Sequence, residues 1–291
     1  MRVSVIIPSL NAPTLGRALA AVVAQSEPPH EVIVVGRDEA GTLQTHPAVQ
    51  FIDTGVPVCA ARARNLGMGA ASGDLFLLLD SDCIPAPDWL ARHRARHAAG
   101  ETVVGGAVAL QGSNYWAQSD NVSMFHDFVP QLPAGPRFLL PTLNLSVRRE
   151  VFAAVGGMDE SFPGAAAEDA DWTVRIRRAG HRLWFDPAAV VAHSPARVAP
   201  RDVVRHWRYL GHNAIRVRLR YADEFKTPNG AQYAWWWRLF SPIIAAGVTA
   251  GIYAKRPLRR YWAGLPVVYA TKIIYCWGAA RAIDSGFATQ P

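Results

Sequence analysis

The sequence predicts an α/β protein, with a mostly parallel sheet flanked by helices, followed by a helical region that is both basic and hydrophobic. In the first two thirds of the 291 residues, short β-branched apolar runs alternate with stretches of helical periodicity. This is the pattern of strands joined by crossover helices. The last third carries long apolar runs rich in tryptophan and arginine. Because half of all residues are apolar, the chain can bury a sizeable core, which excludes a disordered or disulfide-stapled module.

The first strand is expected at Val3–Ile7, because this run is short, β-branched and wholly apolar, as strands buried on both faces are. A turn cluster over residues 8–13 separates it from a helix at 15–25. Asp74–Leu79 (DLFLLL) is the clearest strand of the chain. The polar, proline-rich stretch 113–136 predicts a loop. The same periodicities predict further strands at 31–35, 49–52, 103–110, 139–147, 182–186 and 190–193, and helices at 58–71, 87–98, 149–155 and 165–179.

Two carboxylates follow the DLFLLL strand directly, in Asp80-Ser81-Asp82. Alternate residues of a strand point to the same side, so these carboxylates are expected to project together, at the strand end where open sheets bind ligands. Such a pair repels unless a cation lies between them. Mg²⁺ or Mn²⁺ suits oxygen ligands and also binds diphosphates. A solvated turn is the alternative, but the position after a buried strand favours the metal.

Two further groups have both a structural and a chemical interpretation. Glu168, Asp169 and Asp171 lie near a predicted helix start, where acidic residues commonly interact with the helix dipole. His193 closes the apolar run 189–192, and a packed or capping histidine is the commoner role at such a position. Near an oxygen-ligated metal, a neutral imidazole readily completes the site.

Taken in order and spacing, these residues resemble the family 2 glycosyltransferases, inverting enzymes of the GT-A fold, over roughly residues 1–195. Residues 3–11 (VSVIIPSLN) are similar to the family's opening strand and donor-binding turn, and residues 61–67 (ARARNLG) to its ARNxG helix. Asp80 and Asp82 match the metal-binding DxD motif. Residues 144–152 (NLSVRREVF) and 155–160 (VGGMDE) resemble the part between donor and acceptor sites. Residues 168–171 (EDAD) resemble the ED motif with its catalytic base.

The resemblance implies a hexosyltransferase-type enzyme that moves a sugar from a nucleotide-sugar donor to a hydroxyl of a lipid-linked or cell-envelope glycan acceptor. Asp169 would be the catalytic base, and Asp80, Asp82 and His193 would hold Mn²⁺ or Mg²⁺. The other implied residues are Pro8, Ser9, Asn11, Asp38, Arg64, Asp80 and Ser81 for donor binding, and Asn144, Glu168, Asp171 and Trp172 on the acceptor side.

One departure from the family pattern follows the second strand. The family usually has an acidic pair there, whereas this chain has Gly36-Arg37-Asp38, so an acid remains only at Asp38. The sequence therefore does not identify the nucleotide base of the donor. Two alternatives are a non-catalytic membrane-associated protein that binds a nucleotide sugar, and a nucleotidylyltransferase. The latter would need a lysine in the phosphate loop after the first strand, and residues 9–14 contain none.

The net charge of +7 is unevenly distributed along the chain. Residues 1–193 have a balance of −4, and residues 194–291 have one of +11 with six of the ten tryptophans. Such a segment suits an anionic membrane surface or a nucleic acid. No nucleic-acid-binding motif is present, so we expect no nucleic-acid partner. The three scattered cysteines favour a reducing compartment, and the apolar run after Met1 is too short for a signal peptide.

The C-terminal region is expected to be helical and to associate with a membrane. Trp235–Ala254 and Trp262–Ala280 are each about long enough to cross a bilayer. A spanning hairpin would place the cationic loop 255–260 outside, against the positive-inside rule. We therefore expect monotopic or re-entrant helices at the cytoplasmic face of the bacterial inner membrane. One apolar helical face comprises Val203, Trp207, Leu210, Ala214, Val217 and Tyr221, and a basic one comprises Arg201, Arg205, Arg208, His212, Arg216 and Arg220.

These observations predict two domains. Residues 1–198 would form the GT-A catalytic domain, with nucleotide-sugar binding in 1–110 and the acceptor side in 111–198. Residues 199–291 would form the membrane-associating region, which meets an anionic membrane surface through residues 201–280. The oligomeric state is left open.

Overall fold

The computed structural model describes residues 1–194 and 197–289, and the chain divides into two compact units. The first comprises Met1–Ala109 and Phe128–His193, and the second comprises residues 110–127 together with those from 194 onward. This division differs from the expected boundary at 198. The segment 111–127, predicted to belong to the acceptor side of the first domain, is part of the second unit because its helix packs against the C-terminal helices.

The first four strands of the sheet are parallel, in the order β3-β2-β1-β4. They are β1 (Val3–Leu10), β2 (Glu31–Arg37), β3 (Gln50–Asp53) and β4 (Leu75–Leu79). β1 and β4 are almost wholly buried because helices cover both faces of the sheet. The carboxyl ends of β1, β2 and β4 therefore meet at one edge, as the sequence predicts.

Each of the remaining strands pairs antiparallel with at least one neighbour, so the expectation of a mostly parallel sheet holds only for this first half and the sheet is mixed. Apolar runs look alike in either direction, and the direction follows from the connections. The strands are β5 (Cys83–Pro85), β6 (Val103–Leu110), β7 (Gly135–Pro136), β8 (Asn144–Arg148) and β9 (Leu183–His193). β9 is one strand where two were predicted. The α/β class itself is confirmed.

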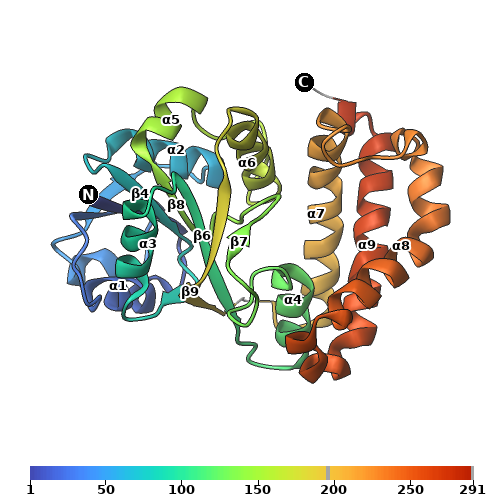
Figure 1. Cartoon of the computed structure of the whole chain (residues 1–291), viewed down its shortest axis with the longest axis horizontal. Coiled ribbons are helices and arrows are strands. Elements are labelled where there is room, and N and C mark those ends of the chain that lie inside the picture. The colour runs from blue at the N-terminus through green and yellow to red at the C-terminus, as the bar shows by residue number, and fades with distance from the viewer. Residues whose placement is uncertain (195–196, 290–291) are drawn as a thin grey trace. The chain divides into compact units, whose positions relative to one another are not determined.

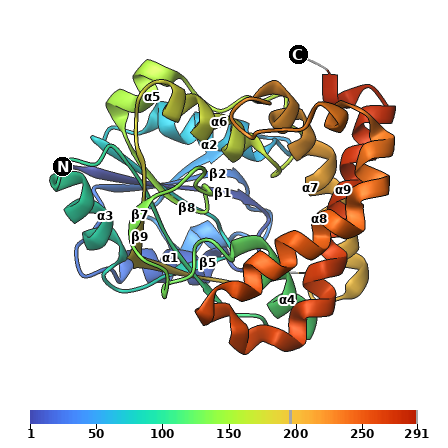
Figure 2. The same ribbon diagram turned by 45° about the vertical axis from the view of Figure 1, so that its right-hand side comes forward.

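Helices cover both faces of this sheet (Figures 1 and 2). One face carries α1 (Leu15–Val23) and α3 (Trp89–Ala98), and the other carries α2 (Ala60–Ala70), α5 (Arg149–Val155) and α6 (Glu168–Arg178). Ile6, Phe76 and Leu78 of the sheet form one buried cluster with Met68 of α2 and Trp172 of α6. This cluster fixes α2 and α6 on the same face of the sheet. A short 3₁₀ helix, η1 (Thr42–Thr45), precedes β3.

The second unit is helical, and α9 packs between α7 and α8 (Figure 1). Its helices are α4 (Tyr115–Phe125), α7 (Pro200–Arg220), α8 (Ala234–Ala254) and α9 (Leu265–Asp284), with the 3₁₀ segments η2 (Asn229–Gln232), η3 (Arg256–Gly264) and η4 (Phe287–Thr289). Within residues 1–194 and 197–289, no helix combines the length and the apolar character needed to cross a bilayer.

Helix α4 lies where the sequence predicts a loop, and that prediction is wrong. Its polar residues look solvent-exposed in the sequence but are buried against the rest of the unit. Asp120 accepts hydrogen bonds from Arg197 Nε at 2.6 Å and Trp207 Nε1 at 2.7 Å. Asn114 caps the helix, because its Oδ1 accepts the backbone N–H groups of the second and third residues after it.

The amphipathic character predicted for α7 is confirmed on its apolar side, where Val203, Trp207 and Val217 are buried. The basic face differs from the prediction at one position. Arg216 is only 3% exposed, whereas Arg201 and Arg205 lie in solvent. The sequence cannot distinguish a buried arginine from its exposed neighbours on the same face.

Candidate active site

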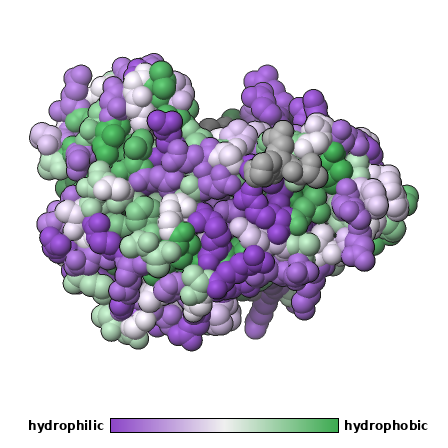
Figure 3. Space-filling model, turned by 90° about the horizontal axis from the view of Figure 1, so that it is seen from above, coloured by the Kyte–Doolittle hydropathy of each residue, from purple (hydrophilic) through white to green (hydrophobic). Residues whose placement is uncertain are grey.

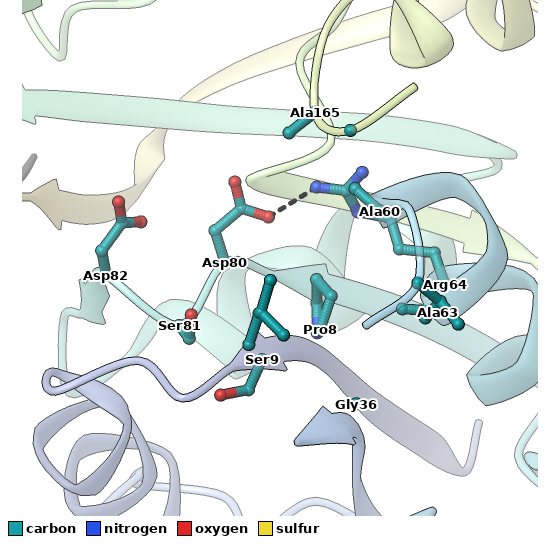
Figure 4. A pocket seen from close by; sticks show the side chains of 13 residues that line it. Pro8, Ser9, Gly36, Ala60, Ala63, Arg64, Asp80, Ser81, Asp82 and Ala165 are labelled. Atoms are coloured by element: carbon teal, nitrogen blue, oxygen red, sulfur yellow. Dashed lines mark hydrogen bonds and ion pairs between the residues drawn. The ribbon is translucent and has the colours of Figure 1, made fainter. Parts of the chain in front are cut away.

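A cavity of about 250 Å³ lies in the first unit at the carboxyl ends of β1 and β4. Its walls are those strand ends, the first turns of α2, and the loop before α6 (Figure 4). The sequence places candidates in all three segments, and the fold brings them together. The lining includes Pro8, Ser9, Gly36, Arg64, Asp80, Ser81 and Asp82. Five of the residues predicted to bind the donor therefore line one cavity.

The floor of the cavity depends on a close approach of β1 and β2. Gly36 has a φ of 136°, and a Cβ atom there would lie 1.9 Å from the carbonyl oxygen of Ser9. Only glycine fits this position. The hydroxyl of Ser9 is buried and has no hydrogen-bond partner among the described residues. A buried orphan hydroxyl beside a cavity is a group that a ligand can satisfy.

The two acidic residues after β4 lie in a turn, because the backbone N–H of Cys83 donates to the carbonyl of Asp80 at 3.0 Å. Because β4 ends at Leu79, Asp80 and Asp82 lie outside the strand. Strand alternation, the basis for expecting their carboxylates to project together, therefore does not apply to them. In Figure 4 the carboxylates of Asp80 and Asp82 nevertheless point to the same side of the turn, and Asp80 points toward Arg64.

Arg64 connects two acidic residues from distant parts of the chain. Its guanidinium donates to Asp80 at 2.7 Å and to Glu168 at 2.8 Å, and both Arg64 and Glu168 are buried. Burial lowers the pKa of the guanidinium, but Asp80 and Glu168 raise it by more, so Arg64 stays charged. Asp80 is thus paired with an arginine at the cavity wall, and its assignment as a metal ligand stays a prediction. Glu168 is likewise a partner of Arg64 and not an acceptor-side group.

Asp169 follows Glu168 in the first turn of α6 and is half-buried. Burial, the adjacent charge of Glu168 and the more distant Asp80 raise the pKa of Asp169 to about 7, although Arg64 and a hydrogen bond from the Ala170 backbone N–H act in the opposite direction. A carboxyl with this pKa exchanges a proton near neutral pH, as a general base must. The raised pKa is compatible with the role of base, and that role stays a prediction.

The second turn acid, Asp82, lies beside His193. Nε2 of His193 is 3.4 Å from Oδ2 of Asp82, because β5 pairs with β9 so that Cys83 faces His193. Carboxylate and imidazole suit a divalent cation, and such an ion takes further oxygens from water and phosphate. Within the described residues, no group of three or more histidine, cysteine or acidic side chains could hold a metal. Asp82 and His193 therefore fit as a two-residue contribution, and a third ligand from Asp80 stays a prediction.

Three residues predicted on the acceptor side have structural roles instead. Asn144 is fully buried in β8, where its Oδ1 accepts from Trp89 at 2.7 Å and His93 at 3.0 Å, and its Nδ2 donates to two backbone carbonyls. Asp171 is buried and paired with Arg175 at 2.9 Å. Trp172 is a core residue whose Nε1 donates to a backbone carbonyl.

Two predicted donor-binding residues also act locally. Both carboxylate oxygens of Asp38 accept backbone N–H groups of η1, at 3.1 and 2.7 Å. Oδ1 of Asn11 accepts the backbone N–H of Glu39 at 2.8 Å. Neither residue lines the cavity. They shape the turns at the ends of β1 and β2, and their assignment to direct donor contact stays a prediction.

Two features of the site were missed from the sequence. A second cavity of about 530 Å³ lies at the end of β3 and is lined by residues that include Asp53, Cys59, Arg62 and Glu160. Asp53 closes a strand, which is a signal that could have identified it. The other feature is Ala167, which has a φ of 74° directly before Glu168. A left-handed alanine stores strain next to the base, and no sequence pattern reveals it.

The fold and the site define a protein of the GT-A class. The fold is similar to that of the mannosyltransferase PcManGT from Pyrobaculum calidifontis, solved with GDP-Man and Mn²⁺, with a TM-score of 0.60 and 19% identity over 94% of this chain and 87% of that one. The family model for glycosyl transferase family 2 matches residues 4–156. The chain therefore belongs to glycosyl transferase family 2.

Two curated relatives agree with this assignment. A pre-mycofactocin glycosyltransferase of Mycobacterium tuberculosis is 30% identical over 77% of this chain and 51% of its own length. Glycosyltransferase AglE of Haloferax volcanii is 30% identical over 74% of this chain and 73% of its own length. The chain thus spans about half the length of the mycobacterial relative and nearly three quarters of the archaeal one.

Proposed function

We propose that this chain transfers a sugar from a nucleotide-sugar donor to a hydroxyl group with inversion at the anomeric carbon. One observation carries the proposal: Arg64, Asp80, Asp82, Asp169 and His193, from distant parts of the chain, gather at one edge of the sheet. The cavity at this edge has an orphan hydroxyl at Ser9 and an arginine in its wall. The GDP-Man complex of the mannosyltransferase with the same fold supports a donor of this kind.

In this proposal Asp169 acts on the acceptor, and the groups at the cavity act on the donor. Asp169 takes the proton from the acceptor hydroxyl while its oxygen attacks the anomeric carbon from the face opposite the leaving group. The bond between that carbon and the diphosphate breaks, and the nucleoside diphosphate leaves with the electron pair. One displacement gives an inverted glycoside, so no carboxylate nucleophile is needed. Arg64 positions Asp80 at the cavity through their 2.7 Å hydrogen bond.

Asp82 and His193 would hold Mn²⁺ or Mg²⁺ together with the donor diphosphate. When bound, the ion neutralises the charge that develops on the leaving diphosphate. The mannosyltransferase solved with Mn²⁺ supports a divalent ion in this fold. Protein ligands from only two residues leave coordination positions for phosphate oxygens, which suits an ion that binds with the donor.

The test is a screen of UDP-, GDP- and dTDP-sugars for nucleoside diphosphate release, with and without Mn²⁺ and with membrane lipid extract as acceptor source. Asp169→Asn should lose transfer and keep donor binding by calorimetry. The matched control is Asp88→Asn, an exposed acid at the start of α3 away from the cavity. Normal turnover by purified Asp169→Asn protein would remove Asp169 from the role of base.

The two alternatives make different predictions in the same screen. A nucleotidylyltransferase would release pyrophosphate from a nucleoside triphosphate, and the phosphate loop of this chain has no lysine. A non-catalytic nucleotide-sugar-binding protein would bind a donor without releasing a diphosphate. The raised pKa of Asp169 favours catalysis over binding alone, because a binding protein needs no group that titrates near pH 7.

We propose in addition that the helical unit binds an anionic membrane at the cytoplasmic face of the bacterial inner membrane, and that the acceptor is a lipid-linked or cell-envelope glycan. Trp235, Leu239 and Ile243 are exposed at four-residue steps along α8. On the face drawn in Figure 3, apolar side chains lie next to charged ones over the helical unit. An interfacial helix buries its apolar side chains at the head-group boundary, while its basic side chains meet anionic lipid. Co-sedimentation with vesicles containing phosphatidylglycerol tests this proposal. Leu239→Ser should weaken binding, and equal binding by this variant would contradict it.

A further inference from the structure

The second unit contains a cavity of its own, of about 330 Å³, between α4 and η3. Its lining includes Asn114, Tyr115, Gln118, Ser119, Arg260 and Tyr261, all of them from this unit. The catalytic proposal uses none of them. No acidic side chain lines the cavity among the residues that the structure describes.

Among the polar side chains that line this cavity, a hydrogen-bond donor is left without a partner. Oε1 of Gln118 accepts the backbone N–H of Gly112 at 3.1 Å, but its amide nitrogen is buried without a hydrogen-bond partner among the described residues. Leaving a buried donor unpaired is costly. Asn114 has both of its amide groups engaged, since Oδ1 caps α4 and Nδ2 donates to the Val198 carbonyl at 2.8 Å. The amide nitrogen of Gln118 therefore has hydrogen atoms to donate, and a bound ligand could supply the acceptor.

Arg260 adds a positive charge to the same wall. Its guanidinium lies 4.8 Å from the ring centre of Tyr261 and donates to the Tyr261 hydroxyl at 2.7 Å. It forms no ion pair with a carboxylate within residues 1–194 and 197–289. Residues 225–283 contain no acidic residue at all. An arginine held by an aromatic ring, with no acid to neutralise it, is suited to a phosphate oxygen.

We propose that this cavity binds a phosphate group, with Arg260 pairing its charge and Gln118 donating to one of its oxygens. Two sources of this chemistry exist, a phospholipid head group and a soluble phosphate ester. The large apolar side chains beside the cavity favour the lipid: Trp262 is 73% exposed and Leu265 is 44% exposed. Tryptophan at such a position is typical of the membrane interface. This inference rests on the proposed membrane association of the helical unit, and it adds a specific binding site for a lipid phosphate.

Two variants and a matched control distinguish phosphate binding in this cavity from non-specific electrostatic attraction to the membrane. Gln118→Glu keeps the acceptor for Gly112 but replaces the orphan donor by a negative charge, so it should repel phosphate. Arg260→Gln removes the cation. Arg259→Gln removes the same charge from the adjacent position, which does not line the cavity. Non-specific attraction would respond equally to the two arginine variants.

The measurements are co-sedimentation with vesicles of phosphatidylcholine alone or mixed with phosphatidylglycerol, and calorimetry with glycerol 3-phosphate. Gln118→Glu and Arg260→Gln should each weaken binding to the anionic vesicles about tenfold, and Arg259→Gln should weaken it much less. Variant-sensitive binding of glycerol 3-phosphate identifies a site for soluble esters, and variant-sensitive binding of vesicles alone identifies a lipid site. Equal losses in Arg259→Gln and Arg260→Gln, or no loss in Gln118→Glu, would overturn the proposal. Diphosphate release from soluble donors should be unchanged in all three variants, so this result is independent of the transferase test.

Discussion

The buried guanidinium of Arg64 donates to the carboxylate of Asp80 at 2.7 Å and joins α2 to the turn after β4. The same guanidinium donates to Glu168 at the start of α6. This one side chain therefore ties together the three segments that form the candidate site. Its loss should affect stability as well as activity.

Arg64→Met should lower the free energy of unfolding by about 3–5 kcal/mol, because it leaves Glu168 charged and buried without its partner. Urea unfolding followed by circular dichroism measures the change. The double variant Arg64→Met/Glu168→Gln removes the stranded charge and should recover part of the loss. If the single variant costs less than about 1 kcal/mol, the pair is not the structural link that its burial indicates.

The raised pKa of Asp169 predicts how activity depends on pH. The base is competent only when deprotonated, so kcat/KM should rise with pH through an apparent pKa of about 7. A profile of kcat/KM between about pH 5 and 9 measures it, with Asp88→Asn as a variant that should follow the wild type. A rising limb near the ordinary carboxyl pKa would contradict the assignment.

The same shift has a consequence for stability. The pKa of Asp169 is higher in the folded than in the unfolded state, so the folded protein is favoured by protonation. That contribution is complete below the unfolded pKa of 3.8 and is lost as pH rises through about 7. Asp169→Asn cannot ionise and should raise the unfolding temperature relative to wild type at about pH 8. It should do so less at about pH 5, where the wild type is largely protonated. An equal effect at both pH values would exclude the raised pKa.

The sequence predicts the features that depend on residues close together in the chain, such as strands and short motifs. The strand periodicity of β1 and β4 located the edge of the sheet, and the motifs indicated Arg64, Asp80 and Asp169 as candidates. The partners of these residues could not be predicted in this way. Arg64 and Glu168 are 104 positions apart, and nothing local indicates that they bind each other instead of a ligand.

The failures have the same cause. Asn144 looks like a site residue, but Trp89, 55 positions earlier, uses its oxygen inside the core. The polar residues of α4 predict a loop until Arg197 and Trp207 supply partners for Asp120. A polar residue is assigned to solvent or to a ligand by default, and only tertiary contacts reveal that the protein itself satisfies it.

Removal of either Asp82 or His193 should weaken Mn²⁺-dependent donor binding, because these two residues are the protein contribution to the proposed ion site. Asp82→Asn and His193→Gln should each lower Mn²⁺-dependent affinity for the donor by at least about tenfold. Calorimetry with the donor nucleotide in Mn²⁺ and in EDTA measures this. Binding that is insensitive to EDTA in the wild type would contradict metal dependence.

Gly36→Ala should disrupt the floor of the cavity, since its Cβ would lie 1.9 Å from the Ser9 carbonyl oxygen. Gly55 is the matched control, because it also has a positive φ, of 70°, but has no atom within 4 Å of the position that a Cβ would take. Gly55→Ala should cost about 1–2 kcal/mol from backbone strain alone, and Gly36→Ala should cost clearly more. Similar losses in urea unfolding would mean that β1 and β2 separate easily.

The close crossing of α7 and α9 gives a prediction for the helical unit. A Cβ atom at Gly211 of α7 would lie 2.0 Å from the carbonyl oxygen of Tyr275 on α9, so these helices approach within backbone contact. Gly251 of α8 is exposed and has nothing within 4 Å of its Cβ position. Gly211→Ala should therefore force the helices apart and destabilise the unit, while Gly251→Ala should stabilise it by up to about 1 kcal/mol through helix propensity. Thermal unfolding of both variants tests the crossing, and a stabilising Gly211→Ala would show that α7 and α9 are not packed this closely.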